Sequence, residues 1–191
     1  MLNFHLKLFQ RVNNNYYPKT LNLNTSWGFF LLQIMKYSRL TKDQFVELHK
    51  EFIDFLSSNS ITYEDWNILK QNNDGKTEGL LDLFSDIVWT KVLGKTRFLE
   101  NISKNHIYLF SFDESEMKFI AIYTENTHVD FTTDDGFSWL RDNLFDDRVK
   151  IYNSNKNYSD DKLADIFDLI KKGGIITKGE LFNYFDELII A

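Results

Sequence analysis

Imidazoles and carboxylates are the groups in this chain that could perform acid–base or metal chemistry. The four histidines never fall in a metal-ligand spacing such as H-x-x-x-H. His128 and Asp130 are two residues apart, so a strand through them would place both side chains on one face, as a general base and its orienting group. The competing interpretation is a solvated pair at a strand edge, because the sequence offers no candidate nucleophile.

Three pairs of adjacent aspartates could supply paired carboxylates for the same kinds of chemistry. They are Asp134-Asp135, Asp146-Asp147 and Asp160-Asp161. The first and last pairs open predicted helices, where negative charge meets the positive end of the helix dipole. The middle pair fits a turn. A structural role is therefore favoured for all three pairs, and we predict no catalytic, cofactor-binding or metal site.

Two short motifs imitate ligand-binding loops. Gly-Lys-Thr tripeptides at 75–77 and 94–96 match the end of a phosphate-binding loop, but Lys70 and Trp89 stand where that loop needs its first glycine. Residues 169–180 resemble a calcium loop, yet its first, third and fifth positions carry no side-chain oxygen. Neither nucleotide nor calcium binding is predicted.

The distribution of charge limits the possible partners. The chain has a net charge of −6, and residues 1–34 hold three cations and no acid, so the remaining 157 residues carry −9. This surplus opposes binding to nucleic-acid phosphates and to anionic membrane surfaces. The same argument disfavours a DNA-binding helix-turn-helix at 159–191, because this segment contains seven acids and only four lysines. We expect no nucleic acid and no membrane as a partner, and a basic protein remains possible.

These observations favour a non-enzymatic, cytoplasmic protein-interaction module with an acidic face. The residues predicted to form that face are Asp142, Asp146, Asp147, Asp160 and Asp161. The alternative is a hydrolase or transferase whose carboxylate and histidine site is assembled by the fold, with His128 and Asp130 as candidates. The chain has no cysteine, which excludes disulfides and zinc–thiolate sites and suits a reducing cytosol.

Helices are predicted from caps and from hydrophobic spacing. An apolar residue followed by a threonine N-cap occurs at Thr41, Thr62 and Thr177, with an acid or amide three positions later. The apolar spacing predicts helices over approximately 42–57, 63–71, 81–92, 137–144, 163–170 and 178–189.

Strands are predicted where β-branched and aromatic residues gather. Residues 107–112 and 117–123 indicate a hairpin, and residues 129–131 and 149–152 indicate two further strands. The predicted fold class is α+β: N-terminal helices, a small and mainly antiparallel sheet of about four strands, and a C-terminal helical hairpin. Residues 35–191 are expected to form a single globular domain.

Residues 1–34 differ from the rest in composition. Their apolar run, Trp27–Met35, is far shorter than the ~20 residues that span a bilayer. A signal peptide is disfavoured because 26 residues precede this run and no small-residue cleavage site follows it. Two interpretations remain: translated sequence upstream of a true start at Met35, or a weakly ordered N-terminal arm.

Three segments resemble a known family. Met35–Gln44, continuing into Glu47–Phe52, resembles the opening of an uncharacterised family of small Bacteroidota proteins, and Gly174–Leu181 is similar to its ending. The resemblance covers essentially residues 35–191. It implies no activity, so it assigns no functional residue.

Overall fold

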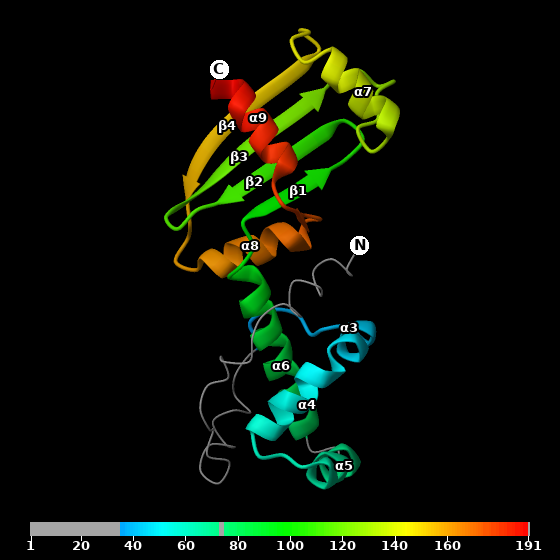
Figure 1. The fold of residues 1–191 in the computed structure, drawn as a ribbon, viewed down its shortest axis with the longest axis vertical. Helices are drawn as coiled ribbons and strands as arrows, with labels where there is room; N and C mark the ends of the chain where they lie inside the picture. Colours follow the sequence, from blue (N-terminus) through cyan, green and yellow to red (C-terminus); the bar gives the residue numbers. More distant parts are fainter. Residues whose placement is uncertain (1–34, 73–74, 191) are drawn as a thin grey trace. The chain divides into compact units, whose positions relative to one another are not determined.

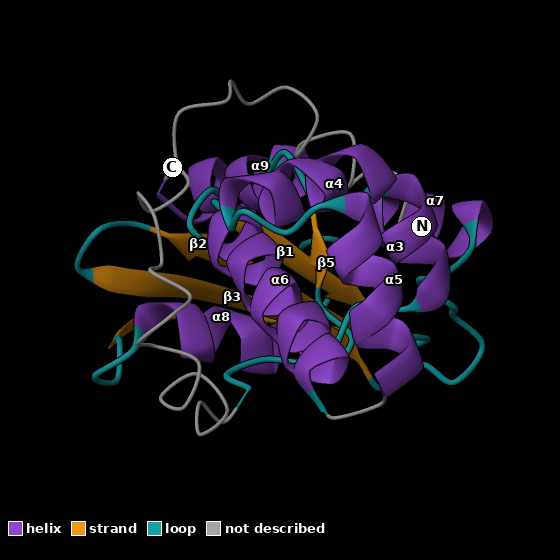
Figure 2. Cartoon of the chain, turned by 90° about the horizontal axis from the view of Figure 1, so that it is seen from below, coloured by secondary structure: helices purple, strands orange, loops and turns teal. Residues whose placement is uncertain are grey.

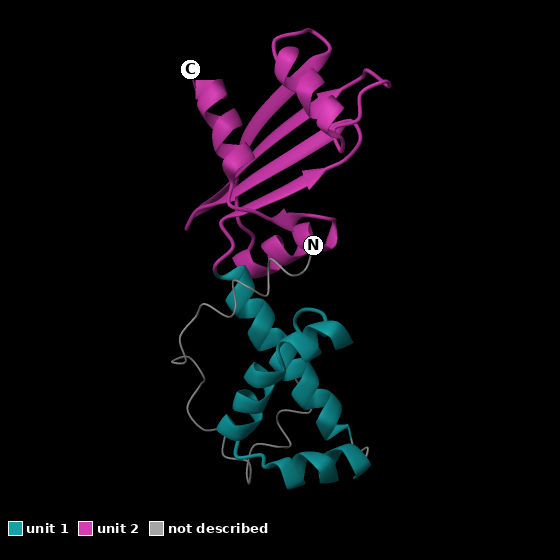
Figure 3. Cartoon of the chain, turned by 45° about the vertical axis from the view of Figure 1, so that its right-hand side comes forward, with its two compact units in different colours: residues 1–94 teal, residues 95–191 magenta. Residues whose placement is uncertain are grey.

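The computed structural model of the chain describes residues 35–72 and 75–190. The predictions made for residues 1–34 therefore lie outside the described residues. The chain divides into two compact units with the boundary between Gly94 and Lys95 (Figure 3). The predicted α+β class is confirmed, because the described part contains seven helices and a five-stranded antiparallel sheet (Figure 1).

The first unit is helical. Its helices are α3 (Lys42–Glu47), α4 (His49–Ser58), α5 (Tyr63–Asn72) and α6 (Lys76–Leu93). The helix predicted over 42–57 is interrupted at Leu48, whose backbone leaves the helical region (φ −99°, ψ 20°) while its side chain is fully buried. The core of this unit is made of Phe55, Phe84 and neighbouring aliphatic side chains.

Two of the three predicted threonine caps are confirmed in this unit. Thr41 and Gln44 form a capping box, in which Gln44 N–H donates to Thr41 Oγ1 over 3.3 Å and Thr41 N–H donates to Gln44 Oε1 over 2.7 Å. At the start of α5, Asp65 N–H donates to Thr62 Oγ1 over 3.1 Å, and the Asp65 carboxylate accepts from Thr62 N–H over 3.0 Å.

The segment before α3 is tied to α6 by hydrogen bonds. The Asp86 carboxylate accepts the backbone N–H groups of Lys36 and Tyr37 over 2.8 and 3.0 Å. Ser85 Oγ accepts Leu40 N–H over 3.1 Å. These bonds satisfy three backbone donors, so residues 36–40 are an integral part of the helical unit.

The second unit is built on the sheet, whose strand order is β4-β3-β2-β1-β5. Its strands are β1 (Phe98–Ile102), β2 (His106–Phe112), β3 (Glu116–Thr124), β4 (Val149–Asn157) and β5 (Ile175–Ile176). The predicted hairpin is confirmed as β2 and β3. The sheet has five strands rather than the predicted four, because β1 and β5 were not predicted and the segment 129–131 is not a strand.

The prediction of a strand at 129–131 is wrong. These residues form a turn, in which the side chains of Val129 and Phe131 are 5% and 0% exposed. Phe131 N–H donates to the backbone carbonyl of Lys104 over 2.7 Å. The apolar alternation at 129 and 131 therefore reflects a turn that buries two side chains in the core.

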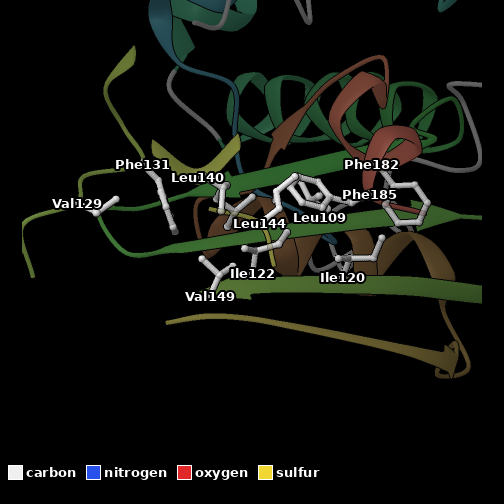
Figure 4. Close-up of a cluster of buried hydrophobic side chains, with 11 residues drawn as sticks. Leu109, Ile120, Ile122, Val129, Phe131, Leu140, Leu144, Val149, Phe182 and Phe185 are labelled. Carbon is white, nitrogen blue, oxygen red and sulfur yellow. The ribbon is translucent and has the colours of Figure 1, made fainter. Parts of the chain in front are cut away.

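Helices lie on both faces of the sheet (Figure 2). Helix α9 (Glu180–Ile190) packs Phe182 and Phe185 on the face of Leu109 and Ile120, and α7 (Asp134–Asp142) contributes to the same core (Figure 4).

Helix α8 (Lys162–Lys171) lies on the opposite face, where the side-chain amide of Asn101 donates to the carbonyl of Lys172 over 2.9 Å. The predicted C-terminal helical hairpin is not confirmed, because β5 separates α8 from α9 and pairs with β1.

Candidate functional site

A groove lies between α7 and α9 on one face of the sheet. It has a volume of about 390 Å³ and is open to solvent. Its apolar lining comes from both helices and from the residues just after α7: Phe137, Leu140, Leu144, Leu181 and Phe185. Leu140 and Phe185 also belong to the buried core, so the floor of the groove is the outer surface of that core (Figure 4).

The position of α7 is fixed at its first turn. Thr133 is the N-cap, and its hydroxyl accepts Gly136 N–H over 3.1 Å. Gly136 lies so close to the preceding turn that a Cβ atom there would be 1.8 Å from the carbonyl oxygen of Asp130. Only glycine fits this contact, which holds one wall of the groove against the core.

The position of α9 is fixed by the chain that follows β5. Gly179 has a φ of +81°, and a Cβ atom there would lie 2.4 Å from the ring of Phe98. The third predicted cap is not formed as expected. Thr177 Oγ1 accepts Gly179 N–H over 3.2 Å and donates to the Glu100 carboxylate over 3.0 Å, while the helix begins at Glu180.

Glu100 is the half-buried acid at the base of α9. Burial raises the pKa of its carboxyl group above the usual value of 4.5, and the nearby Glu180 carboxylate adds to the rise. The hydrogen bond from Thr177 acts in the opposite direction and lowers the pKa. The base of α9 therefore carries a carboxylate whose ionisation is disfavoured by its surroundings.

The two helices that form the rim of the groove carry a surplus of acids. The two helices together hold one cation, Arg141, whose Nε lies 3.3 Å from a carboxylate oxygen of Asp142. Their acids are Asp134, Asp135, Asp142, Glu180, Asp186 and Glu187. Two aromatic side chains are exposed here: Tyr184 lines the groove and is 47% exposed, and Phe145, after α7, is 89% exposed. The groove thus combines an apolar floor with walls formed by two acidic helices, and the charged residues of its lining are Asp134 and Arg141.

The five predicted acidic-face residues form two separate groups. Asp142, Asp146 and Asp147 lie at the end of α7 and in the connection to β4, whereas Asp160 and Asp161 follow β4. The nine residues of β4 place about 27 Å between these groups, at about 3.4 Å per residue. The structure does not bring the five carboxylates together into one patch.

Two of these acids have local structural partners. Asp146 forms an ion pair with Arg148, with Oδ2 and Nη2 2.7 Å apart, and the hydrogen bonds from Arg148 lower the pKa of that carboxyl group. The Asp161 carboxylate accepts the N–H groups of Leu163 and Ala164, so it is the N-cap of α8. The structural roles predicted for these two pairs are confirmed at Asp146 and Asp161.

His128 and Asp130 do not share a strand face, because both lie in the connection between β3 and α7. The Asp130 carboxylate accepts the N–H and the hydroxyl of Thr132 over 3.0 and 2.6 Å, and these bonds lower its pKa. Such an acid is held ionised within its own turn. Among residues 35–72 and 75–190, no group of three or more histidines and acids could hold a metal ion.

The groove itself was not predicted from the sequence, although one signal for it exists. Helix α9 carries more apolar residues than its sheet-facing side needs, since Leu181 and Tyr184 flank the face formed by Phe182 and Phe185. Apolar residues at 181, 184, 185 and 188 follow helical spacing and indicate a second contact surface. The other wall, α7, lies about forty residues away in the sequence.

Comparisons with known proteins place the chain in a family. No helix in the described part of the chain is long and apolar enough to cross a membrane. No curated protein and no solved structure matches the chain. One family model, described as a family of unknown function (DUF6495), matches residues 35–190, a range that includes every residue of the groove. The chain therefore belongs to this family of unknown function, DUF6495.

Proposed function

We propose that the protein is a non-enzymatic interaction module whose α7–α9 groove binds an amphipathic, basic segment of a partner protein. One observation carries this proposal: an apolar groove lies between two helices that hold six acids and a single cation. Apolar anchors of the partner would fill the groove, and its lysines or arginines would meet the acidic rim.

The geometry favours a helical segment over a flat protein surface. Two helices form the walls of the groove, with five lining residues from α7 and three from α9. A helix with apolar residues at i, i+3, i+4 and i+7 presents a ridge that fits between two such walls. The exposed ring of Tyr184 can cover an inserted side chain while its hydroxyl remains in solvent.

The proposal narrows the acidic face predicted from the sequence. Asp142 stays in it as an acid of α7, while Asp160 and Asp161 lie at the far end of β4 and fall outside it. The alternative is a hydrolase or transferase with a carboxylate and histidine site assembled by the fold, and its candidates His128 and Asp130 lie in a connection rather than on one strand face. A cytoplasmic location and a place among Bacteroidota proteins are further parts of the proposal.

A designed peptide tests the groove directly. The probe is a fluorescein-labelled peptide of leucine and lysine, with leucines at helical spacing, titrated with the full chain and followed by fluorescence anisotropy. We expect a dissociation constant in the micromolar range. Tyr184→Ala and Ser138→Trp should each weaken binding about tenfold, or about 1.4 kcal/mol, because the first removes a contact and the second fills the groove.

Two controls distinguish the groove from simple charge attraction. Tyr63→Ala changes a tyrosine that is 76% exposed on α5 and should leave the affinity unchanged. A peptide of the same composition with alternating leucine and lysine carries the same charge without a helical apolar face. If both peptides bind equally well, or if Ser138→Trp keeps the wild-type affinity, the groove proposal is wrong.

A further inference from the structure

The face of the sheet opposite the groove carries a continuous set of aromatic rings. They occupy alternate positions of β2, β3 and β4, and are His106, Tyr108, Phe110, Phe119, Tyr123 and Tyr152. The rings of Tyr123 and Tyr152 lie 6.1 Å apart with an interplanar angle of 6°. Those of His106 and Tyr123 lie 5.6 Å apart at 14°. Neighbouring strands thus present nearly parallel rings.

The set continues across the hairpin. The rings of Tyr108 and Phe119 are 5.8 Å apart at 29°, and those of Phe110 and Phe119 are 5.1 Å apart. At the outer end, Tyr152 stands on the edge strand β4 and is 56% exposed. The rings therefore form a platform whose β4 side is open to solvent.

The charge on this face differs from that of the whole molecule. Lys150 and Lys156 of β4 pair with Tyr123 and Met117 of β3, so they lie on the same face as the rings. The acidic residues of the five described strands, Glu100 and Glu116, pair with Leu109 and Asn157 and occupy the alternate positions that face the other way. Within these strands, the aromatic face is cationic.

We infer that this face binds single-stranded nucleic acid, with a base stacked on the exposed ring of Tyr152 and phosphates near Lys150 and Lys156. Aromatic side chains on a sheet stack bases regardless of sequence, and lysines beside them follow the backbone. An acidic peptide could use the lysines, but it would offer few planar groups to stack on the rings. The inference concerns the opposite face from the groove and stands if the groove proposal fails.

The net negative charge of the chain does not prevent phosphates from binding beside the lysines of this face. Charges in water are screened over about 8 Å at physiological ionic strength. Phosphates at the β4 edge would therefore respond mainly to the nearby lysines. They would respond less to acids on the α7–α9 side of the sheet and to the acids of α8, which lies on the aromatic face beside β1. The expectation of no nucleic-acid partner rested on the net charge of −9 of residues 35–191, whereas this inference rests on the charges of one face of the sheet.

Binding of labelled oligo(U) and oligo(dT) to the full chain, in about 50 mM salt, tests the inference. Tyr152→Ala should weaken binding about tenfold, as expected when one base loses its stacking partner. Lys150→Ala should reduce the slope of log affinity against log salt by about 0.7. Tyr63→Ala is the matched control and should bind like the wild type.

The two oligonucleotides separate RNA from DNA, and binding of either with this dependence on Tyr152 supports the inference. A labelled glutamate-rich peptide is included as the alternative occupant. The inference is overturned if neither oligonucleotide binds at about 100 µM protein, or if Tyr152→Ala binds as tightly as the wild type. It is also overturned if the acidic peptide shows the stronger Tyr152-dependent binding.

Discussion

At the scale of single residues, glycines and a threonine set the width of the groove. Gly136 lets α7 approach the carbonyl of Asp130, and Thr133 caps the same helical turn. Gly179 lets the chain turn into α9 beside the ring of Phe98. The two walls of the groove are therefore positioned by backbone contacts that a larger residue would prevent.

Gly136→Ala should destabilise the protein by about 2 kcal/mol, because its Cβ atom would overlap the Asp130 carbonyl and force α7 away. Gly79→Ala is the matched control. It lies within α6 with nothing within 4 Å of its Cβ position, so it should stabilise by about 0.5–1 kcal/mol. Urea unfolding measures both, and equal effects of the two substitutions would contradict the steric explanation.

Glu100 makes stability depend on pH. Its pKa is raised in the folded state, so the folded chain holds this proton more tightly than the unfolded chain. Stability then falls as the pH rises from about 4.5 through the folded pKa. Glu100→Gln keeps an oxygen to accept the hydrogen bond from Thr177 but removes the charge.

We therefore expect Glu100→Gln to melt at a higher temperature than the wild type at pH 7. The difference should shrink as the pH approaches 4. Thermal unfolding across this pH range measures it. A variant that is less stable at pH 7, or a difference that does not change with pH, would show that burial does not disfavour the charged form of Glu100.

At the scale of elements, local chemistry was predictable and long-range pairing was not. The caps at Thr41 and Thr62 involve residues three positions apart, and the β2–β3 hairpin joins adjacent segments. By contrast, β5 has two residues and exists only because it pairs with Leu99 and Glu100, more than seventy positions earlier. No periodicity can be recognised in so short a strand.

Long-range contacts also limit what the sequence predicts about the two candidate binding surfaces, the α7–α9 groove and the aromatic face of the sheet. The alternation of His106, Tyr108 and Phe110 indicates a strand, but it does not say which face a helix covers. The groove needs α7 and α9 side by side, and their sequences are joined only through β4, α8 and β5. The acids at 142–147 and 160–161 are close in the sequence, but the nine extended residues of β4 separate them in the fold.

Charge reversal at the two ends of β4 should have unequal effects on the affinity for the helical leucine–lysine peptide. Asp142→Lys places a cation on α7, one wall of the groove, and should weaken binding of the helical leucine–lysine peptide several-fold relative to the wild type. Asp160→Lys should have no measurable effect, because about 27 Å of strand exceeds the screening length of about 8 Å. Anisotropy titrations at physiological salt measure the three affinities. An equal loss at Asp160 would contradict the assignment of the rim.

At the scale of the whole molecule, both proposed surfaces belong to the second unit. This unit, residues 95–191, has its own core of buried residues around Leu109, Ile120 and Phe185. The helical unit has a separate core. The single domain predicted from the length of the chain remains a prediction, because a family match over both units does not say whether they fold together.

A chain of residues 95–191 alone should fold cooperatively, because it contains the complete sheet, its helices and its core. A single sigmoidal urea transition, with dispersed amide signals in the NMR spectrum, is the expected result. The shorter chain should also bind the helical leucine–lysine peptide as tightly as the full chain. A gradual transition without dispersed signals would show that the two units depend on each other to fold.

The most direct measurement of the central claim is an amide NMR titration of the full chain with the helical leucine–lysine peptide. We predict that the largest shift changes fall in α7, at 134–142, and in the first two turns of α9, at 180–187. Amides of Asp160 and Asp161 should not move. Shift changes spread over acids throughout the chain, or confined to residues outside α7 and α9, would contradict a binding groove between these helices.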